Sequence, residues 1–314
     1  MHAHVAAGAV DRTLAQPEHP HATLLMQALL ALVCLGAGFI ALAPRWLGDD
    51  ELKVGLELAV AALYLGVALF ARRTASLRQY WQLAFAFFVF AFVQVLNNWV
   101  PGLVGTYVLH DVPNSGNPFA STVGGTVGLQ LLEAAIAIVS VLLLTVVSGS
   151  DLGSIYVRKG RLGTWLLAAL AFFTVFFVFT ATIPLRPGSF AERLLPTNGT
   201  LTVAQFMALS PALIVVSLSN GFEEELLFRG LFLQRYTWLF GAVVANVVQA
   251  AVFAFAHFGV TYTPSAIMFV AVVVFPLGLA AGYLMRATNS IIVPSIVHGA
   301  MDMAIYLTFL TYVS

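Results

Sequence analysis

Six ionisable residues stand within apolar sequence in the last third of the chain, and their types are those that move protons, pair charges or bind metal ions. They are Glu224, Glu225, Arg229, His257, His298 and Asp302. An ionisable side chain at the centre of a bilayer costs about 2.5 to 3.5 kcal/mol on insertion scales, so such residues usually face a protein interior and serve a function. Earlier apolar segments contribute only Glu57, Glu133 and amides such as Gln94, Asn97 and Asn98.

Helical periodicity separates the two adjacent glutamates. Residues four apart on a helix lie about 40° from each other, so Glu225 can pair with Arg229, whereas Glu224 points about 140° away from Arg229. Glu224 shares its face with Ser217, Asn220 and apolar side chains, a setting suited to a general base. The competing interpretation of this segment is an acidic helix end with a structural ion pair.

A second element ends at His257. Gly241 lies near the midpoint between Glu224 and His257. A turn at Gly241 would form an antiparallel helix pair and bring Glu224 and His257 to similar depth. Asn246, three helical turns before His257, is expected on the same helix face as that histidine. Without Glu224, a lone histidine in an apolar helix is more simply a packing residue.

The third element contains His298 and Asp302, whose four-residue spacing stacks them on one helix face. A carboxylate in that position can fix the imidazole tautomer, share a metal or accept a proton. Pro294, one turn earlier, is expected to kink the helix. Counted from the preceding loops, His298 would lie roughly 10 Å shallower than His257 at about 1.5 Å per residue, a gap that tilt or a kink must close.

The composition is that of a polytopic membrane protein. Of the 314 residues, 60% are hydrophobic and 9% are charged, whereas soluble domains contain about 25% charged residues. Lys plus Arg equals Asp plus Glu at 14 each, so there is no basic excess that would indicate a nucleic-acid partner. The single Cys34 can form no intramolecular disulfide. The lipid bilayer is therefore the expected surrounding.

Nine apolar stretches are long enough to cross a bilayer, so the predicted fold class is an all-α polytopic transmembrane helical bundle, with eight spans possible. The spans lie near 23–43, 54–71, 80–100, 126–147, 163–184, 204–236, 238–258, 265–285 and 289–312. Residues 1–22, with Pro17 and Pro20, are expected to form a disordered polar tail.

The basic residues predict an orientation with a cytoplasmic amino terminus. In that topology ten of the 14 Lys and Arg residues lie at or toward the cytoplasmic side, leaving Arg45, Lys53, Arg186 and Arg193 outside. An excess of Lys and Arg in cytoplasmic loops is the usual rule. The loop with His110 and Asp111 carries no Lys or Arg, as expected of an external loop.

Taken in order on successive late helices, the three elements resemble the CAAX protease and bacteriocin-processing family of membrane proteases, also called the abortive-infection family. Its pattern is Glu-Glu-x-x-x-Arg, then Phe-x-x-x-His, then His-x-x-x-Asn or Asp. This chain has Glu224-Glu225-x-x-x-Arg229, Phe253-x-x-x-His257 and His298-x-x-x-Asp302. The resemblance covers about residues 203–312 and implies a catalytic transmembrane domain at 203–314, preceded by transmembrane helices at 23–202 without a recognised motif.

The resemblance implies hydrolysis of a peptide bond of a membrane-anchored protein or peptide, inside the membrane. Glu224 would be the general base, acting with His257 on the attacking water, while His298 and Asp302 would bind metal or stabilise the oxyanion. Glu225 and Arg229 would be the structural ion pair. Glu224, His257 and His298 could together hold zinc, since three such ligands leave a position for water, but the family is also described as glutamate proteases that need no metal.

Two other interpretations use the same residues. A proton-coupled transporter could relay protons through the Glu and His side chains, and a scaffold could retain them without catalysis. Confinement of the polar residues to one end of the chain, without a repeat, argues against a transporter. The substrate class implied by the resemblance is a CAAX protein in a eukaryote, or a leader peptide, bacteriocin precursor or anchored protein in a bacterium. Short loops favour a multi-pass protein of a bacterial plasma membrane.

Overall fold

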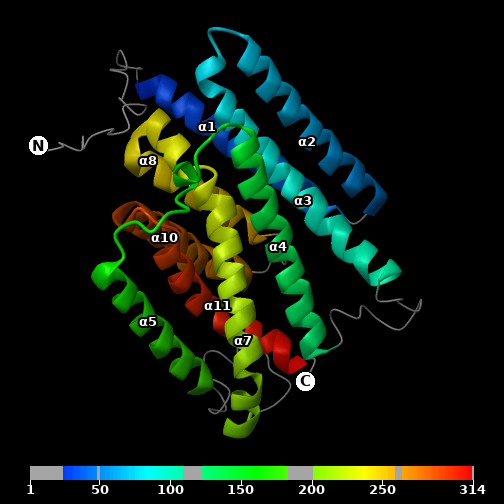
Figure 1. Ribbon diagram of the computed structural model, residues 1–314, viewed down its shortest axis with the longest axis vertical. Helices are drawn as coiled ribbons and strands as arrows, with labels where there is room; N and C mark the ends of the chain where they lie inside the picture. The colour runs from blue at the N-terminus through cyan, green and yellow to red at the C-terminus, as the bar shows by residue number, and fades with distance from the viewer. Residues whose placement is uncertain (1–23, 48–49, 109–121, 183–200, 259–263, 313–314) are drawn as a thin grey trace, which may run out of the picture.

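The protein is a bundle of membrane-length helices in a computed structural model that describes residues 24–47, 50–108, 122–182, 201–258 and 264–312 (Figure 1). The α-helices are α1 (Leu24–Leu42), α2 (Asp50–Arg73), α3 (Trp81–Tyr107), α4 (Val123–Val147), α5 (Gly163–Thr182), α7 (Val203–Glu224), α8 (Leu233–Ala256), α9 (Pro264–Phe269), α10 (Phe275–Thr288) and α11 (Ile292–Tyr312). Shorter elements are the 3-10 helices η2 (Ala43–Trp46), η3 (Arg78–Tyr80) and η4 (Leu152–Ile155), and the π-helices η5 (Glu225–Gly230) and η7 (Val270–Val274).

The predicted fold class is confirmed. In the described part of the chain nine helical segments are long and apolar enough to cross a membrane, and there is no strand. All nine predicted spans correspond to one of these segments. The predicted tail at residues 1–22 and the loop with His110 and Asp111 lie outside the described residues.

The predicted boundary between the sixth and seventh spans is wrong by several residues. The sixth segment ends at Gly230 and the seventh begins at Leu233, where a break near residue 237 was expected. The chain does leave helical geometry at Gly241, with φ 77° and ψ 170°, in a region that glycine adopts without a steric penalty. A short amphipathic segment therefore precedes the main part of α8. Arg229 is fully buried, so it gives no support to the predicted orientation.

Helix α7 leads directly into the π-helix η5. Its start is fixed by a capping box, in which Thr202 and Gln205 satisfy each other's backbone N–H groups. At its end, the Leu231 N–H donates to the Leu226 carbonyl five residues earlier, which is the π pattern. Single π turns occur mostly at functional sites, and this one contains Glu225 and Arg229.

Helices α7 and α11 meet at a close backbone contact between Gly221 and Gly299. A Cβ atom on Gly221 would lie 2.7 Å from the Gly299 nitrogen, and one on Gly299 would lie 2.7 Å from the Ser217 carbonyl oxygen. Small residues allow membrane helices to approach this closely. The contact lies one residue from His298 and three residues before Glu224, so it sets the relative level of the two side chains.

The prediction that Pro294 kinks its helix is wrong, because α11 begins at Ile292 and Pro294 is its third residue. Backbone N–H groups of a first helical turn have no intrahelical acceptor, so proline is tolerated there. The helix begins close to its proline and does not bend around it.

We predict that Gly299→Ala lowers the stability of the protein by about 1 to 3 kcal/mol, since an added methyl group in a tight contact forces the backbones apart. The matched control is Gly66→Ala, because a Cβ on Gly66 meets nothing within 4 Å. Thermal unfolding in detergent should show a lower midpoint for Gly299→Ala alone. Equal midpoints for the two variants would contradict the proposed role of the contact.

Helices α8 and α10 are joined by buried amides. Asn246 donates to the Leu279 carbonyl at 2.9 Å, and Gln249 donates to the Gly278 carbonyl at 2.9 Å. Gly282 leaves the space that these side chains fill, since its Cβ would overlap the Asn246 amide. Asn246 therefore packs α8 against α10 and does not reach the site with His257.

The amino-terminal helices cover the side of the bundle formed by α7 and α8. Helices α2 and α3 run side by side at one edge, α1 packs on α8, and α4 packs on both α3 and α7 (Figure 1). The main core contains Phe90, Phe228, Phe232 and Phe253, whose rings contact one another edge to face. Phe253 connects this aromatic cluster to the polar residues, because its ring also contacts His257 and His298.

Candidate active site

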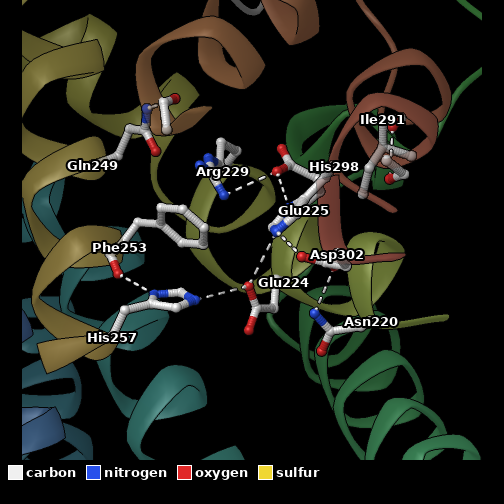
Figure 2. A network of polar contacts seen from close by, with 12 residues as sticks. Asn220, Glu224, Glu225, Arg229, Gln249, Phe253, His257, Ile291, His298 and Asp302 are labelled. Atoms are coloured by element: carbon white, nitrogen blue, oxygen red, sulfur yellow. Dashed lines mark hydrogen bonds and ion pairs between the residues drawn. The ribbon is translucent and has the colours of Figure 1, made fainter. Parts of the chain in front are cut away.

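The carboxylate of Glu224 lies at the centre of the polar cluster, between two imidazoles (Figure 2). Its Oε2 atom is 3.4 Å from His298 Nε2 and 3.8 Å from His257 Nε2. Oε2 is buried and has no hydrogen-bond partner, while the side chain as a whole is 22% exposed. Glu224 thus has one buried oxygen without a hydrogen-bond partner on a side chain that is partly exposed.

Glu225 binds the Nδ1 side of the His298 ring, opposite the Nε2 atom that faces Glu224. Its Nδ1 lies 2.8 Å from Glu225 Oε1, and because a carboxylate accepts, Nδ1 carries the proton. The same Oε1 atom lies 2.9 Å from Arg229 Nη1, so the predicted ion pair is present and fully buried. The Arg229 guanidinium also lies 3.9 Å from the centre of the Phe253 ring, a cation–π contact. Glu225 therefore orients His298 as well as neutralising Arg229, a second role that its spacing from Arg229 does not indicate.

His257 caps the end of α8 and turns its free nitrogen toward Glu224. Its Nδ1 lies 2.8 Å from the Phe253 carbonyl oxygen, which can only accept, so Nδ1 is the donor and Nε2 bears the lone pair in the neutral ring. The side chain is 30% exposed, against 1% for His298. Phe253 packs against both imidazoles. His257 thus has the more accessible position of the two histidines.

The expected depth difference between the histidines is wrong, because both rings reach the same oxygen of Glu224. Counting residues from a loop measures depth only where helices run parallel to the membrane normal, and membrane helices commonly tilt. Here the glycine contact between α7 and α11 sets the level of His298 instead.

Asp302 is connected to α7 and approaches His298. Its Oδ1 lies 3.6 Å from His298 Nε2, and its Oδ2 accepts a hydrogen bond from Asn220 at 3.0 Å. Asn220 precedes Glu224 by one helical turn, so it lies at the same end of α7. Asn220 was placed on the Glu224 face by helical periodicity, but its bond to Asp302 was not predicted.

A further polar network joins the amino-terminal helices to this site. Gln130 of α4 donates to Glu223 at 3.2 Å and lies 3.5 Å from the Asn220 side-chain oxygen. Tyr306 of α11 donates to Gln130 at 2.5 Å, and Asn97 of α3 donates to Glu223 at 3.2 Å. Gln130 and Tyr306 were not predicted as part of the site, although a glutamine within an apolar span is a signal that could have identified Gln130.

Zinc requires at least three converging ligands. Across the described residues, no three His, Cys, Asp or Glu side chains are grouped so that they could hold a metal ion. As placed, Glu224, His257 and His298 do not form a three-ligand site, and zinc at these residues stays a prediction.

A comparison with protein families identifies the late helices. Residues 206–304 match the family described as type II CAAX prenyl endopeptidase Rce1-like. No curated protein and no solved structure matches the chain. The matched segment covers about a third of the chain and contains all six ionisable residues of the cluster. Residues 206–304 of this integral membrane protein are therefore similar to the Rce1-like CAAX prenyl endopeptidase family, in agreement with the resemblance that the three motifs indicated.

Proposed function

We propose that this protein is an intramembrane endopeptidase in which Glu224 acts as the general base on a water molecule. The observation that carries the proposal is the position of Glu224 Oε2, which is buried, lacks a hydrogen-bond donor and faces the Nε2 atoms of His257 and His298. The family match of residues 206–304 supports a protease of the CAAX type. The substrate would be a membrane-anchored protein or peptide.

The water would be held between Glu224 and His257. Their 3.8 Å separation is too long for a direct hydrogen bond, whereas a water beside them can donate one hydrogen bond to each side chain. Glu224 takes a proton as the water oxygen bonds to the carbonyl carbon of the scissile peptide. The resulting tetrahedral species breaks its C–N bond as the amine receives that proton from Glu224, leaving a carboxylic acid and an amine.

The oxyanion would lie on the side of His298 and Asp302. The Nδ1 atom of His298 is committed to Glu225, so only Nε2 can face the substrate, and it serves as a donor when it carries a proton. Asp302 lies against the same Nε2 atom and limits the rotation of the ring. Burial of His298 lowers the local dielectric and strengthens any interaction with the developing charge.

We predict that Asp302→Asn retains most of the activity, because asparagine can still accept the Asn220 hydrogen bond and is the other residue in the family pattern. Asp302→Leu should lower kcat by roughly 10²-fold, comparable to the loss of one oxyanion donor, and leaves Asn220 without its acceptor. Initial rates of peptide cleavage in proteoliposomes check both values. Equal activity of the two variants would show that Asp302 has no part in the site.

The experiment that tests the proposed function is substrate trapping. The Glu224→Ala variant, purified from native membranes, should retain a membrane-anchored protein or peptide that the wild type releases in cleaved form. Mass spectrometry identifies the retained molecule. If the trapped molecule is not cleaved by the wild type, the protease proposal fails. Metal content of the same samples tests zinc: about one zinc per chain, lost in His257→Ala, would support it, and its absence from active protein would contradict it.

The finer identity of substrate and location forms part of the proposal. We infer a leader peptide or anchored precursor as substrate, in a bacterial plasma membrane with the amino terminus in the cytoplasm. The basic residues at the end of α2 and between α4 and α5 support this orientation. Labelling of single cysteines at residues 73 and 161 by a membrane-impermeant reagent should fail in intact cells and succeed in inverted vesicles.

A further inference from the structure

A cavity lies at the opposite end of α8 from His257 and shares no residue with the candidate active site. It has a volume of about 220 Å³ and lies between the start of α3, the η4 loop and the short first part of α8. Its polar wall includes Ser154, Gln234 and Arg235, and its apolar wall consists of Leu83, Trp238 and Leu239. The cavity is therefore amphiphilic.

Three polar atoms in its wall are buried and lack a partner. They are Ser154 Oγ, Gln234 Oε1 and Arg235 Nε. Buried polar groups in native proteins are nearly always hydrogen-bonded, so three such atoms in one cavity indicate a ligand that is absent from the protein chain itself. Two of them can donate and one can only accept.

The charge of Arg235 is also uncompensated. Its Nη1 atom donates to the Leu231 carbonyl at 2.6 Å, but none of the ion pairs between described residues involves Arg235. The carboxylate of Asp151, in the same loop as Ser154, is occupied with the Gly153 N–H at 2.8 Å. Arg235 is partly buried, and its Nε atom is buried without an acceptor. Withdrawing a cation from water without a counter-ion is unfavourable, so the missing ligand should be an anion.

We propose that this cavity binds the phosphate headgroup of a glycerophospholipid. The phosphate would accept from Arg235 Nε and from the Ser154 hydroxyl, and a hydroxyl or ammonium group of the headgroup would donate to Gln234 Oε1. The acyl chains would leave along Leu83 and Leu239. Exposed arginines at the end of α2, Arg72 and Arg73, lie at the same end of the bundle as the start of α3, where anionic headgroups gather beside a basic surface.

The test uses the full chain, purified in detergent and stripped of lipid. Phosphatidylglycerol should raise the thermal midpoint of the wild type and of the control Arg73→Gln, an exposed arginine at the end of α2. In Arg235→Gln the shift should be lost, and retention of the lipid in native mass spectrometry should fall by about tenfold or more, as expected for a hydrogen bond to a charged group. Diacylglycerol with the same acyl chains should give no shift.

Three results would overturn the proposal. An equal shift in Arg235→Gln and wild type would show that Arg235 does not bind the lipid, and a shift with diacylglycerol would show that the phosphate is not recognised. A full shift with inorganic phosphate alone would assign the site to a soluble phosphate compound. If Arg235→Gln does not fold, Ser154→Leu fills the same cavity and should abolish the shift. The proposal does not rest on the proposed function, since neither readout uses activity.

Discussion

Replacing Glu224 by glutamine should lower the rate of peptide hydrolysis by about 10² to 10⁴-fold, the contribution typical of a general base, while the protein stays folded. Glutamine has nearly the same shape, and the side chain lies between two histidines in a partly exposed position, so no buried partner is left unpaired. The measurement is the initial cleavage rate of the trapped substrate in proteoliposomes, with the unfolding midpoint determined on the same sample.

The adjacent residue supplies the matched control. Glu223 is buried and accepts hydrogen bonds from Asn97 and Gln130. None of the ion pairs between described residues joins it to a histidine. Glu223→Gln can lose one hydrogen bond, which contributes about 0.5 to 1.5 kcal/mol, so its rate should fall by about tenfold at most. Wild-type cleavage by Glu224→Gln would refute the general-base role, and a pH-driven solute flux abolished by that change would favour a transporter.

Replacing Arg229 by leucine should destabilise the protein by about 3 to 5 kcal/mol, the range measured when one partner of a buried ion pair is removed. Glu225 would keep its charge in a fully buried position and lose the guanidinium 2.9 Å away. The cation–π contact with Phe253 would disappear as well. Chemical or thermal unfolding in detergent measures the loss, and Arg73→Leu, at an exposed position, should change stability by no more than about 0.5 kcal/mol.

A double variant separates folding from activity. Glu225→Gln combined with Arg229→Leu leaves no unpaired buried charge, so it should recover part of the stability lost in Arg229→Leu. Activity should remain low, because His298 Nδ1 loses the carboxylate that orients it. Full recovery of activity would show that the ion pair serves the fold alone.

The sequence predicted those contacts that lie within one helix or across one turn. The spacing of Glu225 and Arg229 fixed their pairing, and Gly241 marked the place where the chain leaves the helix. The meeting of Glu224 with His257 followed from these two features. Hydropathy located all nine spans because the bilayer sets a single length for every crossing helix.

Contacts between distant helices could not be read in the same way. The level of His298 depends on the Gly221 and Gly299 contact, which no count along a single helix reveals. The bonds of Gln130 to α7 and of Tyr306 to α4 depend on which helices are neighbours. These bonds also give a role to spans without a motif: α3 and α4 supply the partners of Glu223, so the late helices isolated from them would contain a buried carboxylate without donors.

The π-helix η5 gives the site a phase that differs from that of a regular helix. A π turn holds one more residue than an α turn in the same stretch. If the same residues formed a regular α-helix, the side chains before η5 would rotate by about 100° relative to those after it. Hydropathy and length would hardly change, yet Glu224 and Arg229 would no longer serve the same cluster. The chemistry of this protein therefore depends on a local change of helical register, beyond the identity of its polar residues.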